Sequence, residues 1–233
     1  MDNRLYAVKR SLILFHDETH RNKKLKEINF HQKILTHTNI LKLIRSWEEQ
    51  GSLYIQTELC EMDLFQYSQD NRMNDLMIWS LIYQICQALI CLHSLLFVHM
   101  NIKPKKILIT SSSIYKLSDF SRIYNVRYPP TVIENDNTRY LPLEVNHGLI
   151  TTAVDIFSLG LMLVELISKN TYSTLPDDTW NEIHQAKLPP NITDFMDVEL
   201  KNILLQMINP EYQQRPSACS LLNNLIVKEK VRT

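Results

Sequence analysis

The residues that could do chemistry in this chain lie mainly in two short segments, residues 98–108 and 115–121. The first segment carries Asn101 and Lys106, and the second carries Asp119. The amide of Asn101 is not basic at physiological pH, so it cannot accept a proton as a carboxylate base would. The ammonium of Lys106 has three donors and no lone pair, so it cannot bind a metal ion. It could instead stand as a fixed cation beside phosphate groups.

The composition limits the classes of protein to which the chain could belong. Its 233 residues are 45% apolar and 21% charged, which is ordinary for a soluble globular protein and sufficient for one large domain or two lobes. Lysine plus arginine equals aspartate plus glutamate at 25 each, which gives no reason to expect a nucleic acid or an anionic membrane as partner. No apolar run approaches the roughly 18 residues that span a bilayer, and the N-terminus is too polar for a signal peptide. We therefore expect an intracellular chain.

Cysteine and glycine usage exclude two kinds of site. The four cysteines have no metal-site spacing, and we expect them to be buried free thiols: Cys60, Cys86, Cys91 and Cys219. The three glycines are too far apart to build a loop that cradles phosphates: Gly51, Gly148 and Gly160.

The elements that must position the two segments follow from hydrophobic patterning. Residues 4–11 alternate as a strand, and residues 19–35 form a polar helix whose buried side carries Leu25, Ile28 and Ile34. Further strands are expected at 40–44 and 53–60, and helices at 76–96, 155–167, 200–208 and 217–227. Residues 122–139 are expected to form an exposed loop. Strands followed by helices predict an α+β fold with two lobes.

Seven short motifs follow one another along the chain in a recognisable order. They are Ala7-Val8-Lys9 on a strand, Glu27 on a helix, Gln56-Thr57-Glu58-Leu59-Cys60, the loop from His99 through Lys103, Asp119-Phe120, Pro142-Leu143-Glu144 and Asp155-Ile156-Phe157-Ser158-Leu159-Gly160. The chain therefore resembles the protein kinase superfamily over essentially its whole length. It is most similar to the Wee/Myt group, the dual-specificity kinases that inhibit cyclin-dependent kinases, and within it to the membrane-associated Myt branch.

The resemblance implies a protein-kinase-like bilobal fold with a nucleotide site. Residues 1–60 would be a shortened, β-rich N-lobe with the hinge, and residues 61–233 a helical C-lobe. Lys9 would contact the nucleotide phosphates and pair with Glu27, for which the alternative is a solvated charge on a polar helix. At the hinge, Thr57 would be the gatekeeper behind the adenine pocket, and the backbone of Glu58 and Cys60 would hydrogen-bond the adenine edge.

The resemblance also assigns roles in the second half of the site. Asp119 would bind magnesium, and Lys103 would neutralise charge on the transferring phosphate. Glu144 and Arg215 would form a structural ion pair, and Asp155 would brace the catalytic loop. These last three residues are folding residues and imply nothing about turnover.

Four departures from the family pattern put phosphoryl transfer in doubt. Asn101 stands where the family has the catalytic base, whose contribution is about 10²–10⁴-fold. Lys106 stands at the second metal-ligand position. Ser121 replaces a glycine, and we expect a steric cost there if the loop needs a positive φ. The chain also begins at the family's third strand, so the strand that carries Lys9 would have an exposed edge.

These departures leave three functions open. The favoured hypothesis is a pseudokinase that acts through binding, and the alternatives are a weakly active kinase that controls the cell cycle at the G2/M transition and a non-functional truncated duplicate. ATP and magnesium would be cofactors only if nucleotide binding survives. By family analogy the partner would be a cyclin-dependent kinase. Because the chain ends at Thr233 without a hydrophobic segment, we expect a cytoplasmic or nuclear protein without the membrane attachment of the Myt branch.

Overall fold

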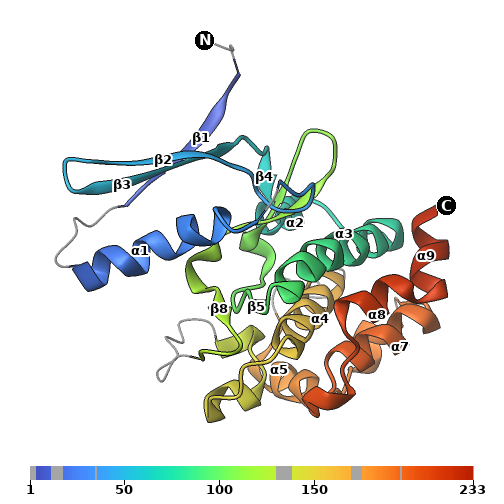
Figure 1. Cartoon of the computed structure of the whole chain (residues 1–233). Helices are drawn as coiled ribbons and strands as arrows, with labels where there is room; N and C mark the ends of the chain where they lie inside the picture. The colour runs from blue at the N-terminus through green and yellow to red at the C-terminus, as the bar shows by residue number, and fades with distance from the viewer. Residues whose placement is uncertain are drawn as a thin grey trace.

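A small sheet lies above a larger group of helices in the computed structural model, as Figure 1 shows. The structure describes residues 4–11, 18–34, 36–129, 138–168, 175–194 and 196–232. The α+β, two-lobed prediction is confirmed.

The upper sheet has three antiparallel strands in the order β1-β3-β2. They are β1 (Tyr6–Arg10), β2 (Leu43–Glu49) and β3 (Ser52–Glu58). β3 is central, and its register places Lys9 opposite Ile55. Within the described residues the outer edge of β1 has no strand partner, which leaves a row of backbone groups available for pairing.

One of the expected strands was wrongly placed. The strand predicted at 40–44 runs from Leu43 to Glu49, and Ile40 makes only an isolated bridge to Leu117. Hydrophobic patterning did not identify this strand because polar residues interrupt the alternation of apolar side chains. On its outward face Arg45 stacks on the ring of Trp47.

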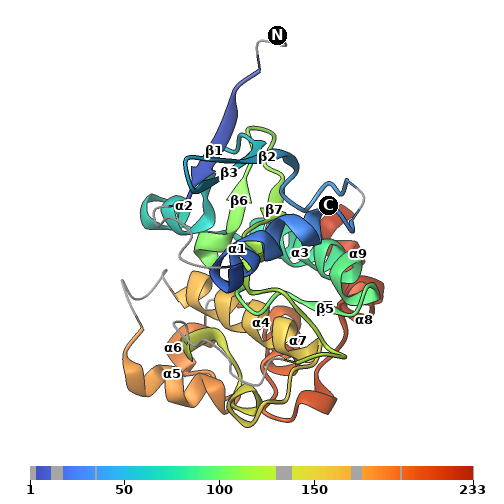
Figure 2. The same ribbon diagram turned by 60° about the vertical axis from the view of Figure 1, so that its left-hand side comes forward.

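Helix α1 (Glu18–His31) joins the sheet to the lower lobe, and both Figure 1 and Figure 2 place it between them. Its residue Ile28 is buried in a small cluster with Leu53 and Ile55 of β3. Phe30, two positions later, faces the other way and belongs to the main core. One helix therefore packs on both lobes and fixes their contact.

The helices of the lower lobe surround α3 and α4. They are α2 (Leu64–Asp70), α3 (Asp75–Ser94), α4 (Ala153–Ser168), α5 (Asp177–His184), α6 (Pro190–Thr193), α7 (Val198–Met207), α8 (Ala218–Asn223) and α9 (Leu225–Arg232). α3 begins where the Asn74 side chain accepts a hydrogen bond from the Met77 N–H at 2.9 Å. Almost every residue of α4 is buried, which explains its uniform apolarity.

Helix α3 corrects the expectation that no apolar run could span a bilayer. By length and composition its 20 residues would suffice. Its contacts are those of a core helix, however, because Ile82, Ile85 and Leu89 are fully buried and α3 packs against α4, α8 and α9. The helix is apolar because it lies in the centre of a lobe.

Five short strands hold the two segments of chemical interest. They are β4 (Met62–Asp63), β5 (Phe97–Val98), β6 (Ile107–Ile109), β7 (Tyr115–Leu117) and β8 (Tyr124–Asn125). β6 pairs antiparallel with β7, which brings the end of the 99–106 loop beside Asp119. β8 pairs with β5, so the loop expected at 122–139 begins with a strand. Residues 130–137 of that loop lie outside the described part of the chain.

Candidate functional site

Lys9 and Glu27 meet between the upper sheet and α1. The Lys9 Nζ lies 3.0 Å from the Glu27 Oε2, and the Lys9 side chain is 59% exposed whereas that of Glu27 is 9% exposed. Although burial opposes its charge, the nearby carboxylates of Glu27 and Asp119 raise the pKa of Lys9. Glu27 is therefore not a solvated helix charge, and the Lys9 ammonium is held in place with part of its surface open.

Asp119 follows β7 and is held by cations and a hydroxyl. Its Oδ2 is in contact with the Lys106 Nζ, and its Oδ1 accepts a hydrogen bond from the Ser121 Oγ at 2.6 Å. The Lys9 Nζ lies 3.9 Å from the same Oδ1. Although burial would raise the pKa of the Asp119 carboxyl, the charges of Lys9 and Lys106 hold it well below its usual range. The carboxylate is ionised, and both of its oxygens are engaged.

The expected steric cost at Ser121 was wrong. The positive φ of this loop, 64°, belongs to Asp119, and Ser121 lies in a 3-10 helical turn at Phe120–Arg122. Aspartate tolerates the left-handed region because its short side chain can hydrogen-bond locally. Here it bonds the Ser121 hydroxyl, so Ser121 stabilises the conformation of Asp119.

Asp155 holds the loop that contains residues 99–106. Its carboxylate accepts hydrogen bonds from the backbone N–H groups of His99 at 2.9 Å and Met100 at 3.0 Å. It also lies 2.9 Å from the Nε2 of His93 at the end of α3. Asp155 is completely buried, so these donors satisfy a charge that would otherwise be costly in the core.

The loop presents Asn101 and Lys103 in different environments. The backbone N–H of Asn101 donates to the Nδ1 of His99 at 3.3 Å, and the residue is 7% exposed. Burial, with the neighbouring charge of Lys106, lowers the pKa of Lys103. The loop thus offers one buried amide and three lysines, of which Lys105 and Lys106 both help to lower the pKa of Lys103, and it offers no carboxylate base.

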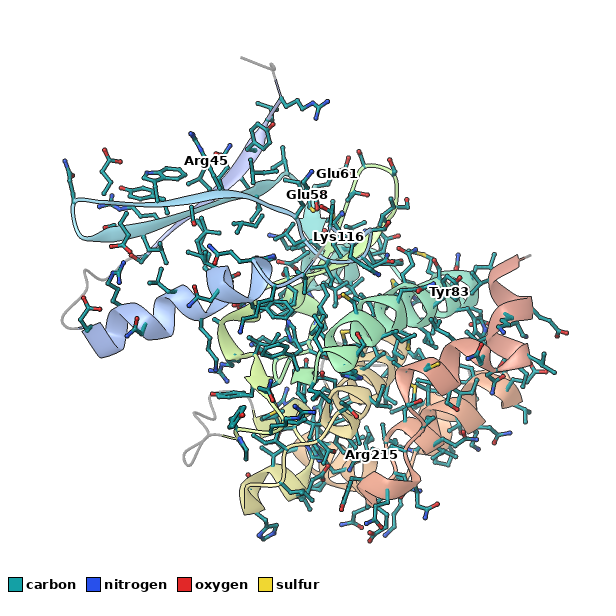
Figure 3. All side chains as sticks on the ribbon, viewed as in Figure 1. Arg45, Glu58, Glu61, Tyr83, Lys116 and Arg215 are labelled. Atoms are coloured by element: carbon teal, nitrogen blue, oxygen red, sulfur yellow. The ribbon has the colours of Figure 1, made fainter. Side chains whose placement is uncertain are left out.

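The hinge after β3 is braced by an ion pair that sequence reasoning missed. The carboxylate of Glu58 lies 2.9 Å from the Lys116 Nζ and accepts the backbone N–H of Lys42 at 2.8 Å. Figure 3 shows Glu58 beside Lys116 where the sheet joins the lower lobe. The Thr57 hydroxyl donates to the Glu58 carbonyl oxygen at 3.1 Å, which leaves that oxygen a second lone pair. In the described part of the chain the Cys60 N–H has no hydrogen-bond partner.

The surroundings of Cys60 disfavour the thiolate form of its side chain. Burial, with the nearby charge of Glu58, raises its pKa to about 11. The expectation of four buried thiols was too broad, because only Cys86 is fully buried and Cys219 is exposed. All four are free.

An aromatic stack connects α1 to the loop that carries Asp119, and sequence reasoning missed it. The ring centroids of Phe30 and Phe120 lie 4.8 Å apart in a stacked arrangement, and His99 meets Phe120 edge-on at 5.2 Å. The available signal was the spacing of Glu27 and Phe30, which puts an aromatic ring one turn beyond the ion-pairing carboxylate.

At the base of the lower lobe, Arg215 and Glu144 form a buried ion pair. The Arg215 Nη2 lies 3.1 Å from the Glu144 Oε2, and the arginine side chain is 0% exposed. Arg215 also donates to the backbone oxygens of Asn209 and Pro210. Figure 3 places Arg215 far from the hinge residues Glu58 and Lys116, so it supports the fold and not the site.

The residues fit a nucleotide better than they fit magnesium. The Cys60 N–H and the Glu58 carbonyl can bond an adenine edge, and Lys9 can contact phosphate. Magnesium needs carboxylate or amide oxygens, but Lys106 occupies the second ligand position and neutralises Asp119. No group of three or more His, Cys, Asp or Glu side chains among the described residues could hold a metal ion.

The comparison with known sequences agrees with this architecture. The protein kinase domain family matches residues 1–226, so the chain belongs to the protein kinase family. It is 34% identical to the membrane-associated tyrosine- and threonine-specific cdc2-inhibitory kinase wee-1.3 of Caenorhabditis elegans, over 99% of this chain and 34% of that protein. It is 33% identical to the Drosophila melanogaster kinase described in the same words, over 96% of this chain and 42% of that protein.

A plant relative extends the same group. The chain is 30% identical to a Wee1-like protein kinase of Oryza sativa subsp. japonica, over 97% of this chain and 43% of that protein. The expected resemblance to the Wee/Myt group is thereby confirmed. The chain spans between about a third and somewhat over two fifths of the length of these three relatives.

Proposed function

We propose that the chain is a Wee/Myt-related pseudokinase, in which phosphoryl transfer to protein tyrosine or threonine is impaired or absent. The observation that carries this proposal is the contact between Lys106 and Asp119. It places an ammonium on the carboxylate that the family uses for metal binding. Asn101 acts in the same direction, because its amide cannot accept a proton from a substrate hydroxyl.

The proposal is tested by phosphate transfer from radiolabelled ATP to a purified cyclin-dependent kinase in the presence of magnesium. Wild-type chain should incorporate no more phosphate than the Lys9→Ala variant. The Asn101→Asp/Lys106→Asn double variant should gain at least about tenfold, because a restored base contributes about 10²–10⁴-fold. Wild-type transfer well above that of Lys9→Ala would show that the chain is an active kinase.

The weakly active kinase is the second candidate, and one observation favours it. Lys9 and Glu27 are paired at 3.0 Å, as an active kinase requires. Single-turnover measurement at high enzyme concentration distinguishes a slow kinase from an inactive one, because slow transfer then accumulates over time and depends on Lys9.

A cyclin-dependent kinase is the proposed partner. The support is that two relatives, from Caenorhabditis elegans and Drosophila melanogaster, are cdc2-inhibitory kinases. Immobilised chain should retain a purified cyclin-dependent kinase and should not retain an unrelated kinase. Equal retention of both would remove the support for a specific partner.

The proposal places the protein inside the cell, in the cytoplasm or nucleus, and divides its lobes between residues 60 and 61. The backbone N–H of Glu61 donates to the Ile109 carbonyl at 2.9 Å, which supports assigning Glu61 to the lower lobe. The burial of α3 in that lobe supports a protein that does not insert this helix in a membrane. Fractionation of cells that express the tagged chain should leave it in the supernatant.

A further inference from the structure

The carboxylate of Asp119 is paired with a cation from the same chain, the ammonium group of Lys106. One oxygen contacts the Lys106 Nζ, and the other accepts the Ser121 hydroxyl at 2.6 Å and lies 3.9 Å from the Lys9 Nζ. A divalent cation at this carboxylate would have to displace Lys106 and would be repelled by both ammonium groups. The geometry is that of an occupied cation position, in which the cation is a side chain.

The charges around Asp119 then determine what the site can attract. Lys9 and Lys106 contact the carboxylates of Glu27 and Asp119, and the charges of Lys106, Arg122 and Lys105 all act on Lys103. Positive charges therefore outnumber the carboxylates in this group. A neutral residue at position 106 would remove the positive charge that is in direct contact with the Asp119 Oδ2, which is where a metal ion supplies positive charge elsewhere in the family.

The same lysines are accessible to a ligand. The side chains of Lys9 and Lys106 are 59% and 24% exposed, so each ammonium keeps donors that its carboxylate partner does not use. A terminal phosphate has several oxygens that accept such donors. The Cys60 N–H at the hinge, unpartnered within the described residues, is available for the base of the same ligand.

We propose that Lys106 replaces the divalent cation of the site, so that the chain binds the polyphosphate of a nucleotide such as ATP without a metal. The inference rests on the proposed function, a kinase-like site that has given up metal-dependent transfer. It goes further in two ways: it proposes that the site still binds a nucleotide, and it proposes that Lys106 contributes to that binding.

The test is calorimetric titration of the full chain with ATP, once in excess EDTA and once in excess magnesium chloride. Wild-type chain should bind in EDTA with a Kd within about threefold of its value in magnesium. Lys106→Asn should bind at least about tenfold more weakly in EDTA and should recover affinity when magnesium is added.

The matched control is Lys105→Asn, which removes the same charge from the neighbouring position. The Lys105 Nζ lies 4.6 Å over the ring of Phe65 and not on Asp119. This variant should bind as wild type in both conditions. Lys106→Met keeps the aliphatic stem without the charge, and it replaces Lys106→Asn in the titration if the asparagine variant does not fold.

Three results would overturn the inference. The first is that the wild-type chain binds ATP at least about tenfold more tightly in magnesium than in EDTA. The second is that Lys105→Asn and Lys106→Asn lose the same amount of affinity for ATP. The third is that the wild-type chain does not bind ATP in either condition. None of these results bears on the proposed absence of phosphoryl transfer, because phosphoryl transfer is measured separately by phosphate incorporation. Conversely, efficient transfer by the wild-type chain would overturn the proposed function while the titration in EDTA still decides the role of Lys106.

Discussion

At the scale of single residues, the contribution of an arginine–glutamate ion pair to stability depends on how deeply the pair is buried. Arg215 is completely buried with Glu144, whereas Arg21 forms a similar forked pair with Glu48 on the surface. A buried charge that loses its partner is destabilising because water cannot solvate it, whereas a surface charge that loses its partner is solvated by water at little cost. The two pairs therefore allow one interaction to be compared in two environments.

Arg215→Lys should destabilise the protein by about 3 kcal/mol or more, because lysine cannot reproduce the planar fork that reaches Glu144 and the backbone oxygens. Urea unfolding followed by circular dichroism gives the free energy of unfolding. Arg21→Lys is the control and should change the free energy of unfolding far less, because water and salt screen an exposed pair. Equal losses for the two variants would show that burial does not distinguish these pairs.

His31 makes stability depend on pH. Burial against the Phe120 ring lowers the pKa of His31 from 6.5 to about 4. Between these values the unfolded chain binds the proton and the folded chain does not, so lowering the pH from about 7 to about 4 favours unfolding. We expect a loss on the order of 1–3 kcal/mol over this range and no contribution above it. In His31→Gln this part of the pH dependence should disappear, and an unchanged profile would contradict the assignment.

At the scale of elements, the sequence predicted types better than boundaries. The apolar periods of α3 and α4 are long and were predicted within about two residues. Strand β2 was misplaced because its outward polar face dilutes the alternation. The pairing of Lys9 with Glu27 was predicted from the motifs and is seen in the structure, whereas the predicted contacts of Lys9 with phosphate and of Asp119 with magnesium stay predictions. The contacts of Lys106 and Ser121 with Asp119 could not be foreseen, because they depend on side chains brought together by the fold.

The crossing of α4 and the end of α7 depends on one glycine. A Cβ on Gly160 would lie 2.7 Å from the Ile208 Cγ2 and 3.0 Å from the Met207 Cβ, so Gly160→Ala should cost about 1–3 kcal/mol by overpacking. Chemical denaturation measures this loss. In the double variant with Ile208→Ala the two costs should be less than additive, because the shortened side chain makes room for the new methyl group. If the two losses of stability are strictly additive, the contact between position 160 and Ile208 is not the cause of the cost of Gly160→Ala.

At the scale of the whole molecule, helix α1 joins two buried clusters. Its Phe30 belongs to the main cluster of the lower lobe, and its Ile28 belongs to the small cluster with Leu53 and Ile55 of the upper sheet. This connection predicts that the small sheet unfolds together with the rest, since neither part keeps its buried surface alone.

Thermal or urea unfolding should therefore give one transition that coincides by circular dichroism and by tryptophan fluorescence. Trp47 lies on β2 in the upper sheet, where its ring stacks on that of Tyr54 with 5.1 Å between the ring centroids. Trp79 and Trp180 are buried in the lower lobe. Trp47→Phe removes the reporter of the sheet and should leave the midpoint seen by fluorescence unchanged. An early fluorescence phase that this variant lacks would mean that the sheet melts first.

The buried carboxylate of Asp155 has a consequence for how this chain can change over evolutionary time. It fixes the 99–106 loop through backbone N–H groups, which every residue except proline provides. Side chains at Asn101 and Lys106 can therefore be exchanged by single mutations while the loop keeps its shape. The residue that holds the loop is therefore separate from the positions at which the chain departs from the family pattern, so those positions can change without loss of the contacts that Asp155 makes.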